Sequence, residues 1–406
     1  MRRGPFLAAL FLVALVLRLQ LVGIGPLLPA IQSDLGISHA VAGLLATIPV
    51  LCMGLFALPA RYLSGRIGSR LAVSVAVGLV AVFGIARAWS PGAAALILLT
   101  FPIGIGMGLA GAILPVVVKE RFADRAGFAT GVYTSGITLG AAAAAALAVP
   151  LSIAAGTWRA PLGIFGAASA ILAIAWIALT RNEPRHARPD ARPLRLPLRS
   201  AVAWHLVASF SFMSAVFYGL NAWLPDVYVD RGWSQSSAGA LLALLVAVTI
   251  PVGFAVAWAA DHWGRRQRWL TAAAALQLVA VLGLIAIPNA AWVWAVMLGV
   301  AIGPLFPLTM TLPLDASSDP ADVAAIAAMM LGVGYTLSAV SPLLLGVVRD
   351  QAGGFTPVLW CIAAAAGALL LVDASLRLKP HKPLETVAAA PVASERDFAS
   401  GVREPR

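Results

Sequence analysis

The chain has 406 residues, 61% of them hydrophobic and only 11% charged, and its mean hydropathy is +0.91. This composition excludes a water-soluble domain of the same size and predicts a protein embedded in a lipid bilayer. The formal net charge of +11 does not indicate nucleic-acid binding, because the basic residues are spread over short loops and the C-terminal tail, as membrane topology requires.

Twelve apolar stretches are long enough to cross a bilayer as helices, which takes about 20 residues each. The first six are predicted over residues 6–29, 39–61, 70–89, 93–118, 126–149 and 158–180. The other six are predicted over residues 200–225, 236–260, 268–288, 290–313, 322–348 and 356–377. The predicted fold class is therefore an all-α polytopic membrane protein with 12 transmembrane helices.

The first span follows Met1-Arg2-Arg3, and a secretory signal peptide is its alternative interpretation. No small-residue cleavage pattern follows the apolar run, and the other spans need this one to complete the topology. Cys52 and Cys361 fall in separate apolar spans, so neither a disulfide framework nor a metal site is indicated. We expect no metal and no cofactor.

The distribution of basic residues predicts the orientation of the chain. If the N-terminus is cytoplasmic, 23 of the 28 Lys and Arg residues lie on the cytoplasmic side and Arg18 lies within a span. Four lie outside, namely Arg87, Arg159, Arg231 and Arg349. Both termini are therefore predicted to be cytoplasmic. The excess of arginine over lysine in an alanine-rich chain is typical of GC-rich bacteria and favours a bacterial inner membrane.

Residues 181–199 form the longest polar stretch before the C-terminal tail and carry six arginines and four prolines. They predict a cytoplasmic linker between an N-terminal six-helix bundle over 1–180 and a C-terminal six-helix bundle over 200–378. Residues 379–406 are polar and rich in proline and alanine, which predicts a disordered cytoplasmic tail.

The two halves of the sequence are similar to each other. A shift of 196 residues aligns them without a gap, placing Leu28-Pro29 on Leu224-Pro225, Asp34 on Asp230, Gly36 on Gly232, Ser38 on Ser234, Gly68 on Gly264, and Gly136 on Gly332. Six helices repeated in the same orientation are the parallel-repeat architecture of major facilitator transporters, in which the substrate lies between two halves that rock to open each side in turn.

The loop after the second span of each half carries a charged pattern. The C-terminal copy reads Asp261-His262-Trp263-Gly264-Arg265-Arg266, and the N-terminal copy, which lacks the aspartate, reads Gly65-Arg66-Ile67-Gly68-Ser69-Arg70. Such charges can pair across the interface between the halves and hold one state. We therefore predict a conformational latch formed by Arg66, Arg70, Asp261, Arg265 and Arg266. The alternative is that these charges only set the topology.

Glycines recur at four-residue spacing in several spans, at 104 and 108, at 127 and 131, and at 136 and 140. Small residues let helix backbones approach closely in lipid, so these spans are predicted to pack tightly. Gly104, Gly106 and Gly108 do not make a dinucleotide-binding loop, because Leu109 occupies the position of the final glycine and no strand precedes them.

Arg18 lies near the middle of the first predicted span, with roughly a dozen helical residues between it and either membrane surface. A charge at that depth must face the bundle interior and have a partner. All 17 Asp and Glu residues fall in loops, tails or span ends, with Asp226 and Asp373 nearest to the membrane interior. We therefore predict that a bound substrate supplies the counter-charge.

The alternative is a structural Arg18 that binds the carbonyls of a helix broken near Gly23, Gly25, Pro26 and Pro29. The repeat places Ser214 opposite Arg18, so the site is expected to be asymmetric. Proton-coupled transporters usually carry buried carboxylates or histidines. Here His39 and His205 lie at span ends and are interpreted as interfacial groups rather than proton relays.

Several motifs together resemble one branch of the major facilitators. They are Leu17-Arg18, Gly25-Pro26-Leu27-Leu28-Pro29, Leu35-Gly36, Ala42-Gly43-Leu44-Leu45, Ile48-Pro49-Val50, Gly131-Val132-Tyr133, Tyr218, Trp223-Leu224-Pro225 and Gly334-Tyr335. In these motifs the chain resembles the cyanate and 2-nitroimidazole transporter family across the whole membrane region.

The resemblance implies transport of small, often anionic or nitro-bearing solutes. It also implies a substrate site, for which we name Arg18, Tyr133, Tyr218, Asn221, Trp223 and Tyr335. Met213 stands where a glutamine is expected five residues before Tyr218, so cyanate itself is not assigned. Without the resemblance, these aromatic and amide residues are amphipathic groups in apolar spans, and Trp223 could be an interfacial anchor.

The predicted function is a secondary active transporter of a small anionic or anion-like solute, acting as a monomer without nucleic acid. A broad exporter of drugs or metabolites is the first alternative. The buried arginine opposes it, as does the fifth span, which continues Gly140-Ala141-Ala142 instead of the Gly-Pro element of many drug antiporters. A membrane enzyme is the remote alternative, because no cluster of catalytic residues is present in the sequence.

Overall fold

The computed structural model describes residues 3–122, 126–181, 196–264, 266–317 and 319–376, and these residues form helices and no strands. The predicted linker therefore lies mostly outside the described residues, and the predicted tail lies wholly outside them. Eleven helical segments are long and apolar enough to span a membrane, and a bent pair brings the number to twelve. The prediction of an all-helical protein with twelve spans is confirmed.

The first half of the chain contains α1 to α8 with one short 3₁₀ helix, η1. Their bounds are α1 Arg3–Val22, η1 Gly25–Leu27, α2 Leu28–Leu35, α3 His39–Leu55, α4 Ala57–Ile67, α5 Ser69–Ala88, α6 Ala93–Arg121, α7 Ala126–Ala155 and α8 Arg159–Thr180. The second half contains α9 Ala201–Asp230, α10 Gln235–Trp263, α11 Arg266–Ala286, η3 Pro288–Ala290, α12 Ala291–Ala316, α13 Pro320–Ser338, α14 Val340–Ala352 and α15 Thr356–Ser375.

Three spans are broken, each four residues before a proline. Helix α1 ends at Val22 before Pro26, α3 ends at Leu55 before Pro59, and α13 ends at Ser338 before Pro342. Proline has no N–H and its ring clashes with the carbonyl four residues earlier, so the helix ends or bends there. At the second break the axes of α3 and α4 differ by 56°.

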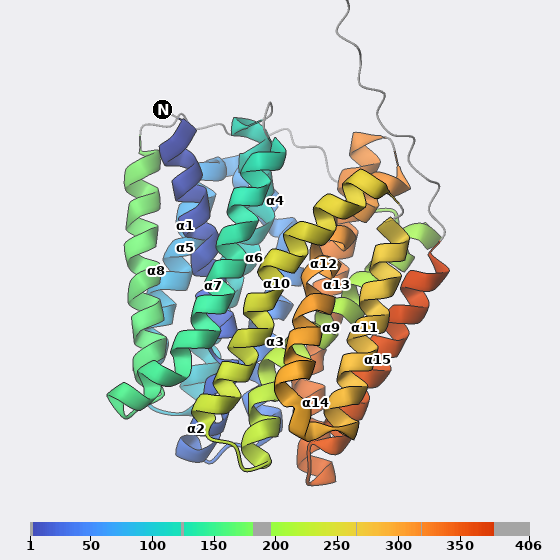
Figure 1. Ribbon diagram of the computed structural model, residues 1–406. Helices are drawn as coiled ribbons and strands as arrows, with labels where there is room; N and C mark the ends of the chain where they lie inside the picture. Colours follow the sequence, from blue (N-terminus) through green and yellow to red (C-terminus); the bar gives the residue numbers. More distant parts are fainter. Residues whose placement is uncertain (1–2, 123–125, 182–195, 265, 318, 377–406) are drawn as a thin grey trace, which may run out of the picture.

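The helices of each half lie together, and the two groups stand side by side (Figure 1). Across the interface, α3 packs on α13 and α14, α7 packs on α10, and η1 and α2 pack on α9. We call the end of the molecule that carries the N-terminus the near end. The opposite end, which carries the turns at residues 36–38 and 353–355, is called the far end.

The internal repeat is visible in the local structure of these turns. Ser38 and Ser234 each cap the following helix by accepting a backbone N–H three residues later, from Val41 and Ser237. Gly36 and Gly232 precede them with positive φ angles of 60° and 87°, a conformation that favours glycine. The two halves therefore use the same turn where the sequence alignment places it.

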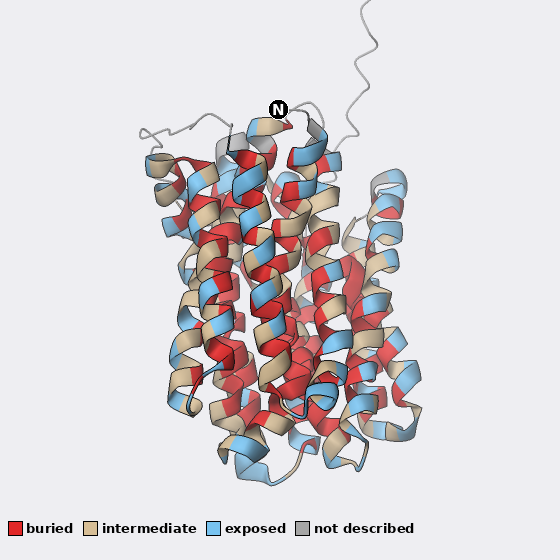
Figure 2. Cartoon of the chain, turned by 90° about the vertical axis from the view of Figure 1, so that its left-hand side faces the viewer, coloured by how far each residue is buried: buried red, intermediate tan, exposed pale blue. Residues whose placement is uncertain are grey.

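Buried residues lie mainly on the inward sides of the helices and exposed residues on their outward sides (Figure 2). Many of the exposed residues have large apolar side chains. Examples of the outer group are Leu98, Ile171 and Leu371, which are 66%, 66% and 72% exposed. Such a surface fits lipid. The predicted close packing is confirmed at two glycine pairs: a Cβ at Gly136 or Gly140 would meet the carbonyls of Phe11 or Leu15 in α1, and one at Gly104 or Gly108 would meet α3. It is not found at Gly131, where a Cβ would meet nothing within 4 Å.

The predicted latch is described only in part, because Arg265 and the side chain of Asp261 lie outside the described residues. Arg70 donates to the Arg181 carbonyl at 2.8 Å, and Arg266 pairs with Asp315 at 2.9 Å. The Arg66 guanidinium lies over the Tyr62 ring, 4.5 Å from its centre. Each of these partners belongs to the same half as its arginine, so a latch between the halves stays a prediction.

Candidate functional site

Arg18 crosses the interface between the halves near the middle of the membrane. Its Nη1 donates to the Tyr218 hydroxyl of α9 at 2.9 Å, and it also interacts with the Tyr335 hydroxyl of α13. The side chain remains half-buried although the chain around it is largely buried. The structure therefore brings together three of the predicted site residues, one from the first half and two from the second.

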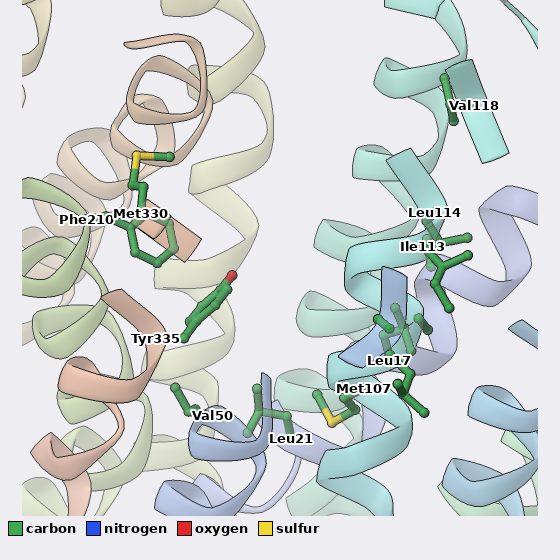
Figure 3. Close-up of a cluster of buried hydrophobic side chains, with 14 of the residues drawn as sticks. Leu17, Leu21, Val50, Met107, Ile113, Leu114, Val118, Phe210, Met330 and Tyr335 are labelled. Carbon is green, nitrogen blue, oxygen red and sulfur yellow. The ribbon is translucent and has the colours of Figure 1, made fainter. Parts of the chain in front are cut away.

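Aromatic side chains hold the two tyrosines in place. The Phe210 ring meets the Tyr335 ring edge-on, with 4.8 Å between the ring centres, and the ring centres of Phe217 and Tyr218 are 5.2 Å apart. Figure 3 shows the Tyr335 hydroxyl pointing away from Phe210. A Cβ at Gly334 would come within 2.6 Å of Phe210, so this glycine lets the two rings meet. Phe210 has no feature in the sequence that marks it as a site residue beyond its apolar character.

No carboxylate pairs with Arg18 among the residues that the structure describes. Its partners are neutral hydroxyl groups, which leaves the charge uncompensated in a medium of low dielectric constant. A guanidinium beside two phenolic hydroxyls supplies several hydrogen-bond donors and a positive charge. This donor set is suited to a small anion and unsuited to a metal or an organic cation.

Met213 lies in the same hydrophobic cluster as Tyr218, and Thr309 is buried beside Met213. The Thr309 hydroxyl of α12 donates to the Met213 sulfur at 3.7 Å. Met213 is the position where the resemblance predicts glutamine, and a thioether is a weak acceptor that cannot donate. The departure therefore makes this part of the interior less polar.

Tyr133 lies closer to the near end than Arg18 does. Gly136 of α7 packs on Phe11 of α1, and Gly140 packs on Leu15, so α7 and α1 run parallel in this region. By this register Tyr133 is about ten residues, or roughly 15 Å along the helix axis, from the level of Arg18. The structure leaves Tyr133 half-buried and does not join it to the arginine–tyrosine group.

Asn221 and Trp223 lie farther toward the far end, where the halves are in contact. The backbone of Asn221 packs on Gly25 so closely that a Cβ on the glycine would overlap the Asn221 carbonyl. Trp223 is fully buried: its indole donates to the Pro342 carbonyl of its own half at 2.9 Å, and its ring centre lies 5.7 Å from that of His39 in the first half. These two predicted site residues therefore help to close the far end in this conformation.

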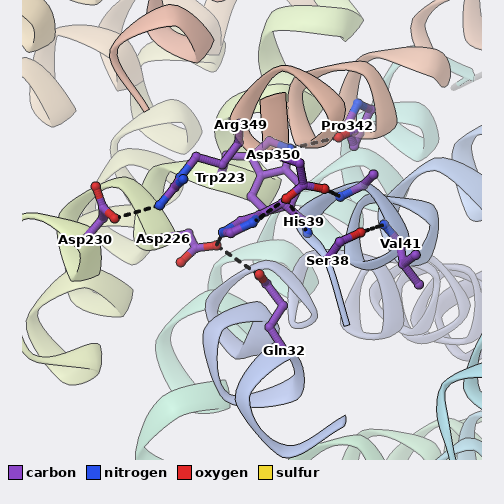
Figure 4. A network of polar contacts seen from close by, with 11 residues as sticks. Gln32, Ser38, His39, Val41, Trp223, Asp226, Asp230, Pro342, Arg349 and Asp350 are labelled. Atoms are coloured by element: carbon purple, nitrogen blue, oxygen red, sulfur yellow. Dashed lines mark hydrogen bonds and ion pairs between the residues drawn. The ribbon is translucent and has the colours of Figure 1, made fainter. Parts of the chain in front are cut away.

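The closure is formed by a seam between α3 of the first half and α14 of the second, which we call the far-end seam. The Asp350 carboxylate accepts the backbone N–H groups of His39 and Ala40 at 3.0 and 2.8 Å, and it lies 2.8 Å from His39 Nδ1 (Figure 4). It thereby caps the start of α3 from the opposite half.

Three further contacts strengthen the far-end seam. Leu343, at the start of α14, donates its N–H to the Thr47 hydroxyl of α3 at 3.2 Å. A Cβ at Gly43 would come within 2.6 Å of the Pro342 carbonyl, and one at Gly346 would overlap the His39 carbonyl. The backbones of α3 and α14 therefore touch directly, and no solute can pass between them in this conformation.

The two histidines have different surroundings. His39 lies between Asp350 and Asp226, whose oxygen is 3.8 Å from Nε2, while Gln32 donates to the same Asp226 oxygen at 3.0 Å. It is thus part of the contact between the halves and not a free interfacial group. His205 lies within one half, with Nε2 at 3.1 Å from the Val372 carbonyl and 3.0 Å from the Ser375 hydroxyl.

A second arginine, Arg87, is fully buried at the end of α5. The loop pattern groups Arg87 with the basic residues on the outer side; the structure places it in the last turn of α5 with its side chain buried between helices, while the orientation of the chain stays a prediction. The Arg87 Nη2 donates to the Gln20 backbone carbonyl at 3.1 Å and to Gln20 Oε1 at 2.6 Å. Binding the carbonyls of a broken first helix is the structural role that was the alternative for Arg18. In the structure Arg87 fills that role, while Arg18 binds the opposite half.

Comparisons with known proteins show the family to which the chain belongs. The model of the Major Facilitator Superfamily matches residues 10–339. The chain belongs to this superfamily. The cyanate transport protein CynX of Escherichia coli is 31% identical over 86% of this chain and 91% of its own length. The 2-nitroimidazole transporter of the same bacterium is 30% identical over 89% and 92%. The chain is thus a member of the branch that contains these two proteins.

The fold is similar to that of solved transporter structures. A bacterial homologue of the human lysosomal transporter Spinster, in an inward-facing and occupied conformation, superposes with a TM-score of 0.74. Its sequence is 17% identical, and the superposition covers 92% of this chain and 95% of the other. This protein is therefore a multi-pass membrane transporter of the twelve-helix major facilitator fold, and not an enzyme.

Proposed function

We propose that this protein carries a small anion, or a small solute with a strongly polar anion-like group, between the two faces of a bacterial inner membrane. The substrate class rests mainly on one observation. Arg18 lies at mid-membrane, half-buried, and its partners are the hydroxyls of Tyr218 and Tyr335. A bound anion would supply the missing counter-charge and gain charge-assisted hydrogen bonds.

The relatives favour the same chemical class. One is named for cyanate, a small linear anion, and another for 2-nitroimidazole, whose nitro group carries partial negative charge on its oxygens. Both solutes are small enough to contact the guanidinium and the two tyrosines at once. The methionine at 213 argues against assigning cyanate specifically, because it removes an amide that could hold one particular substrate.

The mechanism that we propose is alternating access. In this conformation the far-end seam joins α3 to α14 on one side of Arg18. Separating the two halves at that seam would expose the site to the far end, and closing them at the near end would complete the exchange. We place the near end in the cytoplasm, with both termini, and we propose that the monomer is the working unit. Arg66, Arg70, Asp261, Arg265 and Arg266 would help to hold the near end closed.

The test is binding by the purified protein of cyanate, nitrate, a short carboxylate and 2-nitroimidazole, measured as thermal stabilisation. At least one of these solutes should stabilise the wild type. Arg18→Ala and Arg18→Lys should lose the effect by about 100-fold or more in Kd, since a buried charged contact contributes roughly 3 kcal/mol.

A matched control is Arg231→Lys, because Arg231 contacts the Leu284 carbonyl at 3.4 Å within the second half. That variant should bind like the wild type. Normal binding by the folded Arg18 variants would overturn the proposal. Stabilisation by apolar amines instead of anions would favour the broad drug exporter.

A further inference from the structure

Arg87 is a buried charged residue that the proposed transport cycle does not use directly. It is 0% exposed, and its Gln20 partner is 1% exposed. Asp34, a carboxylate of the same half, pairs instead with Arg159 at 2.8 Å. The partners of Arg87 among the described residues are the backbone and the side chain of Gln20 alone, and its Nε and Nη1 have none. The role of Arg87 must therefore be found at Gln20.

Gln20 lies at the end of α1, which stops at Val22 inside the membrane. The last four carbonyls of a helix have no partner within it, and each needs a donor when no water is near. Ile24 donates to the Leu21 carbonyl at 3.4 Å, and Arg87 donates to that of Gln20. A positive charge at this position also interacts favourably with the negative, C-terminal end of the helix dipole. Arg87 thus caps α1 from a neighbouring helix.

The contact has little freedom to change its geometry, because glycines let the helices around it approach closely. A Cβ at Gly84 of α5 would come within 2.5 Å of Gln20 Nε2. A Cβ at Gly166 of α8 would lie 2.5 Å from the Ile85 nitrogen, and one at Gly23 would lie 2.7 Å from the Phe165 ring. Helices α5 and α8 therefore fix the end of α1 within the first half.

Arg18 precedes Gln20 by two residues, which places the two side chains on nearly opposite sides of α1, about 200° apart. Arg18 reaches across to the second half, while Gln20 faces α5 and Arg87. A shift or rotation of the end of α1 would move both side chains together. Holding Gln20 on one side therefore determines where the Arg18 guanidinium lies on the other.

We infer that Arg87 is a positioning residue for the anion site, which holds the end of α1 through Gln20 and so sets the place of Arg18. The inference rests on the proposed function, because Arg18 is the group that it positions. It predicts that Arg87 variants weaken anion binding although Arg87 touches no substrate. It also predicts that the end of α1 loosens in these variants when no ligand is present.

The first experiment uses whichever of cyanate, nitrate, the short carboxylate and 2-nitroimidazole stabilises the wild type most. It measures the Kd for that solute of Arg87→Gln, Arg87→Lys and Gln20→Leu, with Arg159→Gln as the control. We expect about tenfold weaker binding in Arg87→Gln and Gln20→Leu, from the lost charged hydrogen bonds, and partial recovery in Arg87→Lys. Arg159→Gln removes an arginine of the same half that pairs with Asp34, so it should change stability without changing the Kd.

A double-mutant cycle separates positioning from a general loss of stability. Tyr218→Phe removes the hydroxyl that receives Arg18 Nη1, so it weakens the same contact from the other side. Positioning predicts that the losses of Arg87→Gln and Tyr218→Phe combine to less than their product. A purely structural role predicts that Arg87→Gln leaves the Kd unchanged, both in the wild-type protein and in the Tyr218→Phe variant. That result would overturn the inference.

Hydrogen exchange of the protein without ligand provides a readout that does not depend on the substrate. The amides of residues 19–25 should exchange faster in Arg87→Gln than in the wild type or Arg159→Gln. If Arg87→Gln does not fold, Gln20→Leu serves in its place, and a wild-type Kd with wild-type exchange in that variant overturns the inference. A wild type that binds none of the four solutes contradicts the proposed function, and unchanged exchange contradicts the holding of α1.

Discussion

Two arginines, Arg18 of α1 and Arg87 of α5, make contacts on opposite sides of helix α1 and have different environments. On one side Arg87 contacts Gln20 within the first half and is fully buried. On the other side Arg18 contacts Tyr218 and Tyr335 of the second half and remains half-buried. A contact within one half persists while the halves move, but a contact between the halves must break. The comparison therefore separates the permanent frame of the protein from the parts that work in the cycle.

The same distinction applies to the far end. Asp350 and Asp230 belong to one half, but Asp350 caps α3 of the other half, whereas Asp230 pairs with Arg349 of its own half at 2.9 Å. Two carboxylates that look alike in the sequence should therefore behave differently on substitution. Substitutions at residues that join the halves should change the balance between conformations, and those at residues within one half should change stability.

The largest effect is expected from Gly43→Ala at the far-end seam. Its Cβ would lie 2.6 Å from the Pro342 carbonyl and 3.0 Å from the Leu343 Cα, both backbone atoms that cannot rotate away. Overpacking of this kind costs roughly 1–3 kcal/mol, so uptake into proteoliposomes should fall by about tenfold or more. The control is Gly78→Ala on α5, where a Cβ meets nothing within 4 Å. Equal uptake by both variants would contradict the closure of this seam during transport.

Asp350→Asn should produce the next largest effect. It weakens the cap that holds the start of α3, by about 1–2 kcal/mol, and so favours separation at the far end. Spin labels at Ser33→Cys and Thr356→Cys, with both native cysteines replaced by alanine, report that distance, because both positions are exposed and lie in opposite halves. The distance should lengthen in Asp350→Asn and stay unchanged in Asp230→Asn. An equal lengthening of the distance in both variants would contradict the view that Asp350 joins the halves while Asp230 acts only within its own half.

Tyr218→Phe should weaken anion binding by roughly threefold to tenfold, which corresponds to about 0.7–1.4 kcal/mol, the net contribution of one typical hydrogen bond. Arg18 keeps its interaction with Tyr335 in this variant, so binding is reduced and not abolished. Tyr228→Phe is the matched control on the same helix, because the Tyr228 hydroxyl donates at 3.2 Å to the Pro288 carbonyl of its own half. Titration calorimetry with cyanate compares the two Kd values, and an unchanged Kd in Tyr218→Phe would place the anion elsewhere.

The smallest effect is expected from Thr47→Val. It removes the acceptor of the Leu343 N–H in the far-end seam and leaves the shape of the side chain unchanged. The expected shift toward separation is about 0.5–1 kcal/mol, which the same spin-label pair detects as a small longer-distance population. Thr100→Val removes a hydroxyl that bonds to the Leu96 carbonyl within its own helix, so it should leave the distance unchanged.

The sequence by itself determined the parts of this protein that depend on local pattern. Apolar length predicted the spans, the shift of 196 residues predicted the repeated turns at Gly36 and Gly232, and the depth of Arg18 required an interior partner. These properties are local because hydrophobicity, turn conformation and distance from the membrane surface follow from neighbouring residues.

Only the tertiary structure decided which residues meet across the chain. It brought Tyr218 and Tyr335 to Arg18, moved Asn221 and Trp223 into the closure of the far end, and left Tyr133 outside the group. It also buried Arg87 against Gln20, a contact that no pattern in the sequence indicates. The reason is physical: side-chain partners hundreds of residues apart are set by how helices cross and rotate, and no single-span pattern records that geometry.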